Sequence, residues 1–193
     1  MYKLIITSLF LISMHLSMAQ KVRVKEKYPF GKLTLEPAVG TRLSTVLGAA
    51  DIQVSNLLQY NITNRLSFVA HTGLSFDIPA QRFSDVKQHY SYTVFQKVGI
   101  GSTLYSKRTA HAFFIVGGLK YNAYSGTLIN NQFSEHITTK TSSVTSDYGM
   151  LYNLKWGKKK YFFSGRLYLP LKDGTNGMIE NTNVEFGIGL RIR

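Results

Sequence analysis

The sequence predicts an all-β protein, an antiparallel up-and-down barrel of eight strands. Apolar and polar residues alternate with a period of two along eight segments, which is typical of strands with one apolar face. The links between these segments are mostly short and long in turn. After the first 19 residues, no segment shows a convincing helical period of 3.6 residues.

The first 19 residues have the features of a secretory signal peptide. Lys3 supplies the positive charge, residues 4–16 form an apolar run, and Ala19 is a small residue suited to cleavage before Gln20. The run is shorter than the roughly 20 residues of a spanning helix, which argues against a retained anchor. We therefore expect a signal peptide at 1–19, a periplasmic N-terminal segment at 20–31 and a barrel domain at 32–193.

Composition narrows the classes of protein and partner. The chain has no cysteine, which excludes a lipid-anchored lipoprotein, a disulfide scaffold and thiolate metal sites. Its 23 Lys and Arg against 10 Asp and Glu give a net charge of +13. These basic residues are scattered or grouped in short turns, and an exported barrel does not meet the genome. We expect anionic lipid or glycan as the partner of this charge, and no nucleic acid.

The first four expected strands, 32–43, 50–60, 65–77 and 90–105, each have one apolar face. Their apolar positions are, in order, Leu33, Leu35, Val39 and Leu43; Ile52, Val54, Leu58 and Tyr60; Leu66, Phe68, Ala70, Leu74 and Phe76; and Tyr92, Val94, Val98, Ile100 and Leu104.

The last four expected strands are 111–124, 144–156, 161–171 and 183–193. The final one is the clearest, because five apolar residues from Val184 to Ile192 share one face. Segment 111–124 is less regular, since Phe114 and Val116 lie on its polar face. The pairing of this segment, and with it the number of strands, stays open.

The connections predict the topology. Tight turns are expected at 61–64, 106–110 and 157–160, and long polar links at 78–89, 125–143 and 172–182. Outer-membrane barrels have this asymmetry, with short periplasmic turns and long external loops. The link at 44–49 is short and departs from the trend. An even number of strands returns both chain ends to the periplasmic side.

Three features favour a membrane barrel over a soluble one. Glycines such as Gly73, Gly99 and Gly118 lie on the polar faces beside isolated charges, as in a narrow lumen. Most expected strands have about 10–14 residues, against about 5–6 in soluble proteins. Aromatic residues flank the tight turns, as at membrane interfaces, although Tyr105 has the parity of the polar face. These aromatic residues are Tyr60, Tyr105, Trp156, Phe68, Phe113 and Phe163.

The chain resembles the small outer-membrane β-barrel proteins of Gram-negative bacteria, a porin-like group. The resemblance covers essentially the whole region after the signal peptide and rests on the hairpin at 60–68, YNITNRLSF, the strand 98–101, VGIG, and the closing strand 184–190, VEFGIGL. It implies an outer-membrane location, contact with outer-membrane lipids and insertion by the barrel-assembly machinery. The family commonly ends its last strand on an aromatic residue, whereas this chain ends on Arg193.

Eleven ionisable residues are expected in the lumen, where a buried charge is costly unless it is paired. They are Glu36, Arg42, Asp51, His71, Asp77, Lys97, Asp147, Lys155, Arg166, Glu185 and Arg191. We expect a network of ion pairs that fills a barrel too narrow to conduct, with no catalytic residue, metal or cofactor. The five histidines show no ligand spacing.

The function that we expect is a structural or surface-interaction role, with an extracellular partner recognised by the external loops. One alternative is a narrow pore or small-ligand conduit. Another is an enzyme that modifies lipid A or phospholipids with His71, Ser75 and Asp77, although His71 and Ser75 would lie about 13 Å apart along one strand. The basic turns at 107–108 and 158–160 and the segment 21–27 face anionic lipid head groups or simply solvent.

Overall fold

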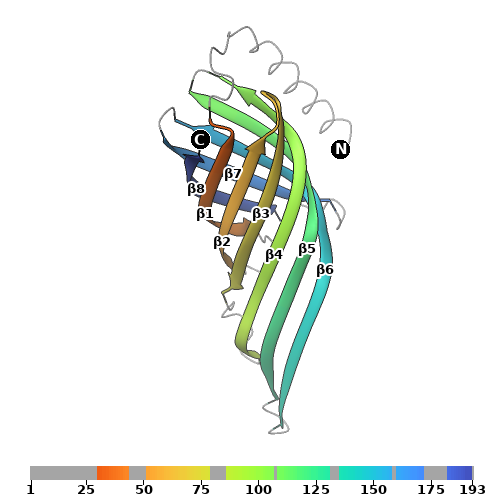
Figure 1. Cartoon of the computed structure of the whole chain (residues 1–193). Coiled ribbons are helices and arrows are strands. Elements are labelled where there is room, and N and C mark those ends of the chain that lie inside the picture. Colours follow the sequence, from red (N-terminus) through yellow and green to blue (C-terminus); the bar gives the residue numbers. More distant parts are fainter. Residues whose placement is uncertain are drawn as a thin grey trace, which may run out of the picture.

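The chain forms a closed barrel of eight antiparallel strands in a computed structural model (Figure 1). The structure describes residues 30–43, 51–78, 86–106, 108–130, 135–157, 160–171 and 182–192. The expected signal peptide at 1–19 and almost all of the segment at 20–31 lie outside these residues. Within the described ranges, no helix has the length and hydropathy needed to cross a membrane.

The strands follow one another around the barrel in chain order. They are β1 (Leu33–Leu43), β2 (Asp51–Asn61), β3 (Leu66–Asp77), β4 (Val86–Tyr105), β5 (Thr109–Asn130), β6 (Glu135–Trp156), β7 (Tyr161–Pro170) and β8 (Thr182–Ile192). Leu33 of β1 lies opposite both Tyr60 of β2 and Ile192 of β8, which closes the sheet. The predicted fold class and strand number are confirmed, and β5 pairs along its length with both neighbours.

The three tight turns lie at one end of the barrel, which we call the turn end. Backbone hydrogen bonds close two of them, from Ile62 N to Leu66 O at 2.9 Å and from Ser106 N to Thr109 O at 2.8 Å. The first residue of β1 and the last of β8 lie at the same end, because they are paired. This is the arrangement that the alternation of short and long links predicted.

Three neighbouring strands continue well beyond the others at the opposite end (Figure 1). Strand β4 has 20 residues, and β5 and β6 have 22 each, whereas the other five have 10 to 12. The prediction of loops at 78–89 and 125–143 is therefore wrong in part, since 86–89, 125–130 and 135–143 belong to strands. We call the part formed by 86–91, 122–130 and 135–144 the protruding sheet.

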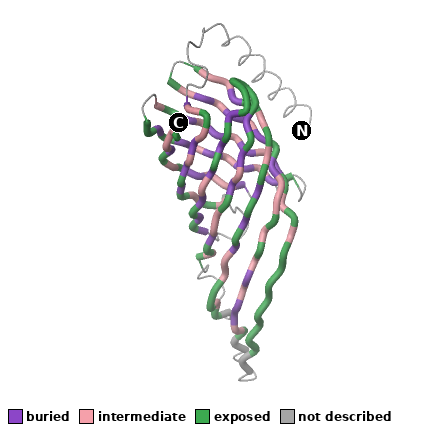
Figure 2. The backbone as a smooth tube through the Cα atoms, in the orientation of Figure 1, coloured by how far each residue is buried: buried purple, intermediate pink, exposed green. Residues whose placement is uncertain are grey.

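The wall of the barrel is apolar outside and largely polar inside. Burial alternates strictly along β2, and exposed and buried positions alternate through the wall in Figure 2. Ile115, Phe186 and Val39 are 71%, 68% and 60% exposed, while Gln53 and Glu185 are buried. A closed sheet with an apolar outer surface and a polar interior can cross lipid, because all backbone groups of the wall are paired.

Glycines make room for aromatic rings inside the lumen. Gly189 lies directly opposite Phe162, and a Cβ atom at Gly189 would come within 2.1 Å of Phe162 Cζ. Gly101 faces Phe114 in the same way. The polar parity of Phe114, which made 111–124 irregular in sequence, thus reflects a ring that packs inside the barrel.

Candidate functional site

The lumen is the first candidate site, because the expected ionisable residues project into it. Near the turn end, Glu36 of β1 forms an ion pair with Lys155 of β6, and both side chains are buried. Asn153 donates to the second oxygen of Glu36 at 2.8 Å, and Lys155 Nζ donates to Thr34 Oγ1 at 3.0 Å. The pair is therefore shielded and hydrogen-bonded, as a buried pair must be to persist.

Glu185 of β8 is the centre of the next group. Arg166 Nη1 lies 2.8 Å from its Oε2, and His71 Nε2 lies 3.2 Å from its Oε1. Ser55 donates to Glu185 at 2.6 Å, and Gln53 donates to it as well. Residues from β2, β3, β7 and β8 thus converge on one buried carboxylate.

Lys97 and Asp147 form the third pair, with Nζ and Oδ2 at 2.8 Å. Tyr168 completes this group, because its hydroxyl donates to Asp147 and its ring centroid lies 3.3 Å from Lys97 Nζ. An aromatic face stabilises a desolvated ammonium group, so Lys97 is compensated from two sides.

The last group lies in the lumen at the end of the barrel opposite the turn end, and it is partly exposed. Arg42 reaches Asp77 at 2.6 Å and Asp51 at 3.4 Å. Ser75 donates to Asp51 at 2.6 Å, and Ser91 donates to Asp77. This rim group links β1, β2, β3 and β4.

The structure places ten of the eleven expected residues in six close charged contacts, with His71 charged only when it is protonated. The eleventh, Arg191, donates instead to Gly157 O at 2.8 Å and lies over the ring of Phe30, 4.5 Å from its centroid. Phe30 packs edge-on against Phe162 and is stacked with Tyr105. Tyr105 therefore closes the turn end from within and does not contribute to an outer aromatic belt.

Neutral polar residues also belong to the lumen, although they were not among the residues expected there. Gln59 donates to Asn61 at 2.8 Å and to Ser67 and Thr103 at 3.2 Å. Gln59 has the same strand parity as Asp51 and Gln53, so the alternation of β2 contained the signal.

The three residues of the alternative enzyme do not form a catalytic group. His71 is fully buried and contacts Glu185, Ser75 donates to Asp51, and Asp77 contacts Arg42. Each residue has its own partner from another strand. In the part of the chain that the structure describes, no group of three or more His, Asp or Glu could hold a metal ion.

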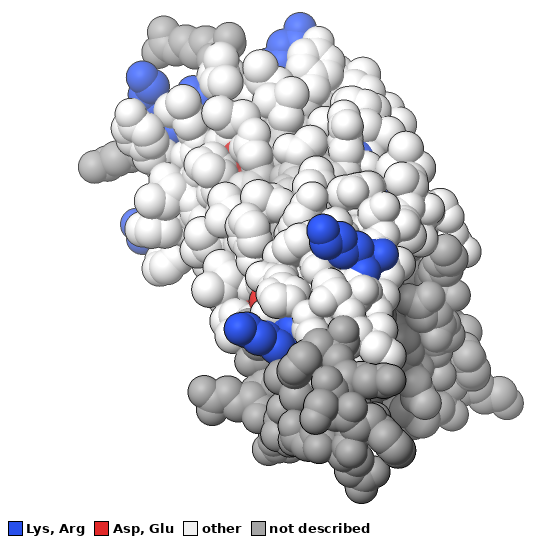
Figure 3. Space-filling model, turned by 90° about the horizontal axis from the view of Figure 1, so that it is seen from below, with Lys and Arg blue, Asp and Glu red and all other residues white. Residues whose placement is uncertain are grey.

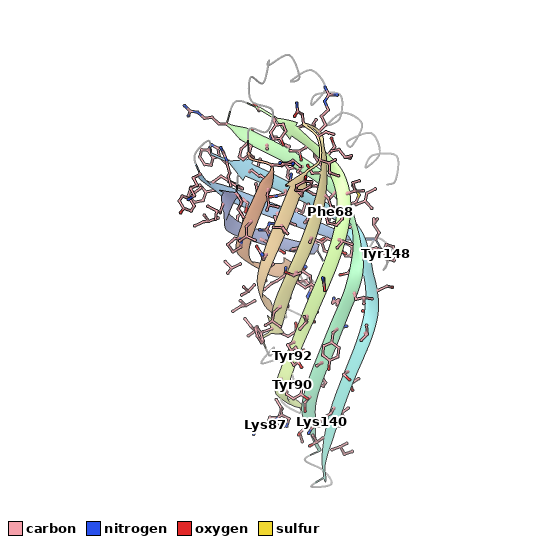
Figure 4. The ribbon with its side chains drawn as sticks, viewed as in Figure 1. Phe68, Lys87, Tyr90, Tyr92, Lys140 and Tyr148 are labelled. Carbon is pink, nitrogen blue, oxygen red and sulfur yellow. The ribbon has the colours of Figure 1, made fainter. Side chains whose placement is uncertain are left out.

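The protruding sheet is the second candidate site. Residues 137–144 of β6 are all exposed, so both faces of this strand are accessible (Figure 2), whereas Ala123 and Ser125 of the neighbouring β5 are buried. In the register, β6 pairs with β7 only from Gly149 onward. Lys87 and Lys140 lie near the tips of the long strands, and Tyr90 and Tyr92 lie nearer the barrel (Figure 4).

Charge is distributed unequally between the lumen and the outside. All five carboxylates whose side chains the structure describes belong to the lumenal groups: Glu36, Asp51, Asp77, Asp147 and Glu185. Seen from below, where the long strands end in Figure 1, lysine and arginine atoms reach the surface and carboxylate atoms are almost hidden (Figure 3). At the turn end, Lys32, Arg65, Arg108 and Lys160 are exposed, whereas Lys107, Lys158 and Lys159 lie outside the described residues.

Comparison with known proteins gives likenesses among solved structures. No family model matches the chain, and no curated protein matches it. The N-terminal β-barrel domain of Pseudomonas aeruginosa OprF is 11% identical, with a TM-score of 0.47 over 83% of this chain and 97% of that one. Neisserial surface protein A is 9% identical, with a TM-score of 0.49 over 83% and 96%. Ail, the attachment invasion locus protein of Yersinia pestis, is 9% identical, with a TM-score of 0.48 over the same shares.

Proposed function

We propose that the protein spans the outer membrane, with its turn end in the periplasm, and presents the protruding sheet at the cell surface as an element that binds an extracellular partner. The single observation that carries this proposal is the continuation of β4, β5 and β6 beyond the barrel, with residues 137–144 exposed on both faces. Paired strands hold such a surface in one shape, which lowers the entropy lost on binding compared with a loose loop.

The filled lumen supports a scaffold role. Lys97, Phe114, Lys155, Leu57 and Leu151 are among its largest buried side chains, and each is at most 2% exposed. An interior of eight strands is about wide enough for side chains alone. The interior therefore favours a scaffold over a conduit, and the separate partners of His71, Ser75 and Asp77 disfavour an enzyme.

Labelling of single cysteines on intact cells tests the proposed orientation, because the natural chain has no cysteine. We expect a membrane-impermeant maleimide to label Thr139→Cys on intact cells. Thr63→Cys, in the turn between β2 and β3, is the matched control and should react only after the outer membrane is permeabilised. Equal labelling of the two variants on intact cells, or labelling of Thr63→Cys alone, contradicts the orientation.

Truncation tests the proposed role. Cells that express the full chain should bind an extracellular matrix preparation, and cells in which residues 124–141 are replaced by Asn-Gly should lose that binding. Surface amounts of both proteins are matched by labelling at an added cysteine in the barrel rim. Undiminished binding by the shortened protein removes the protruding sheet as the recognition element.

A further inference from the structure

The chemical character of the outer face of β4, β5 and β6 changes toward the tips of the strands. Aliphatic residues come first, then tyrosines, and then lysines and hydroxyl groups. Residues opposite each other in an antiparallel pair point to the same side of a sheet. Val94, Tyr121 and Val144 form one such row, and the rows beyond it are Tyr92–Ala123–Ser142, then Tyr90–Ser125–Lys140. After an irregularity at His89, the row Lys87–Thr127–Thr138 follows.

Tyrosines mark the first step. The ring centroids of Tyr90 and Tyr92 are 6.0 Å apart, and those of Tyr92 and Tyr121 are 6.2 Å apart. The three rings form a continuous strip next to the exposed aliphatic residues Val94, Val98 and Leu119. Aromatic rings with polar tips favour the level where acyl chains meet head groups.

Cations mark the second step. Lys87 lies beyond the tyrosines and Lys140 lies in the same row as Tyr90 (Figure 4), and both lysines are exposed. The six charged contacts among the described residues involve neither lysine. Every carboxylate whose side chain the structure describes belongs to the lumenal groups, so the described side chains of this outer face carry positive charge without a negative partner among them.

Hydroxyl groups accompany the lysines. His89 Nε2 lies 2.8 Å from Thr127 Oγ1, which lies 2.9 Å from Thr138 Oγ1. This short chain of hydrogen-bonding groups is at the level of Lys87 and lies next to the row of Lys140. It offers donors and acceptors of the kind that sugar hydroxyls require.

We propose that this outer face binds the phosphorylated sugar head group of an outer-leaflet glycolipid. The aliphatic rows contact its acyl chains, the tyrosine strip lies against its sugar, and Lys87 and Lys140 bind its phosphates. The proposal rests on the outer-membrane orientation proposed above, because the tyrosine strip must lie at the level of the outer head groups. We choose a phosphorylated ligand because its charge complements that of the two lysines, whose ammonium groups bind phosphate as point charges.

The test is a titration of the refolded full chain in phosphatidylcholine nanodiscs with diphosphorylated lipid A or with enzymatically dephosphorylated lipid A. The paired variant is Lys87→Gln/Lys140→Gln, and the matched control is Arg65→Gln/Lys160→Gln at the turn end. A lysine near an anionic lipid surface is worth about a fivefold change in binding, so we expect the paired variant to bind diphosphorylated lipid A about 30-fold more weakly. The control variant should bind like the natural chain.

Two results overturn the proposal: equal affinity for the phosphorylated and dephosphorylated lipids, or an equal loss of affinity in both variants. A second variant, Tyr90→Ala/Tyr92→Ala, should weaken binding of both lipids, because it removes the sugar contact and leaves the cations. The cysteine labels distinguish the two proposals. If Thr139→Cys is labelled on intact cells while the natural chain binds phosphorylated and dephosphorylated lipid A equally, the proposed glycolipid site is wrong and the proposed orientation stands.

Discussion

Glu185 shows how single residues hold the lumen together. Its carboxylate accepts hydrogen bonds from Ser55 and Gln53 and lies beside Arg166 and His71. Removal of one member of such a buried group leaves an uncompensated charge, which costs far more than the intact pair contributes. The lumen is therefore most sensitive where one group serves several partners.

We predict that Glu185→Gln lowers the free energy of unfolding by about 3–5 kcal/mol, because Arg166 then keeps a buried charge without a counterion. Urea titration in lipid vesicles, read by the change in gel mobility between folded and unfolded forms, measures this loss. Asp77→Asn at the partly exposed rim is the control and should cost less than about 1 kcal/mol. Similar losses in the two variants would mean that burial does not set the strength of these pairs.

The glycine at position 189 is sensitive for a steric reason. A Cβ atom there would lie 2.1 Å from Phe162 Cζ, and Phe162 is itself held against Phe30. We predict that Gly189→Ala destabilises the barrel by about 1–3 kcal/mol, the usual cost of overpacking. Gly165→Ala is the matched control, because its Cβ would meet only Phe186 at 3.9 Å. The same urea titration checks both, and an unchanged midpoint for Gly189→Ala would show that the Phe162 ring can move aside.

At the scale of the element, the sequence predicted the strands that cross the barrel wall and missed the protruding sheet. Alternation identifies a strand only where its two faces meet different surroundings. Within the wall, Ile52 faces outward while Gln53 faces the lumen, so β2 was recognisable. Residues 137–144 are exposed on both faces, and nothing selects apolar residues for one of them.

The sequence predicted which charged residues face the lumen better than it predicted which of them pair with each other. Strand parity places Glu36 and Lys155 on inner faces, but they are 119 positions apart in the sequence and meet only because the sheet closes. Tilt and register decide which inner residues come level with each other, and these depend on all eight pairings together. The same reason explains why Arg191 lies against Phe30 and is not paired with any of the five lumenal carboxylates that the structure describes.

We predict that the protruding sheet can be shortened without loss of the barrel. Ala123 and Ser142 lie directly opposite each other, so an Asn-Gly turn in place of residues 124–141 can close the hairpin there. Residues 137–141 of β6 are exposed, and the buried residues among the described removed positions of β5 are the small Ser125 and Gly126. Little buried surface is therefore lost, and the shortened chain should keep its heat-modifiable mobility on gels. Loss of that mobility shift would mean that the extension is needed for folding.

At the scale of the whole molecule, the apolar band implies a defined position in a bilayer. Trp156 is the single tryptophan of the chain, is 61% exposed and lies at the turn end. We predict that phospholipids brominated near the head group quench its fluorescence more than those brominated near the chain end, because tryptophan favours the interface. Trp156→Phe provides the background signal. Emission typical of water without quenching by either lipid would contradict membrane insertion.

The filled lumen predicts that the barrel does not conduct. Inner side chains from facing strands, such as Leu57, Phe114 and Leu151, form one buried cluster, and the charged groups on either side of it are paired. Ions would have to displace this cluster, whose close packing resists small shifts. Planar bilayers that contain the natural chain should therefore remain electrically silent.

A variant that empties the cluster gives this prediction a positive control. Phe114→Ala/Leu151→Ala removes two buried side chains that are 2% and 1% exposed, so water can enter the middle of the lumen. We expect brief openings of low conductance in this variant, provided that its heat-modifiable mobility shows a folded barrel. Steady openings of the natural chain itself would reject the closed lumen and favour the conduit, since only a continuous aqueous path carries a sustained current.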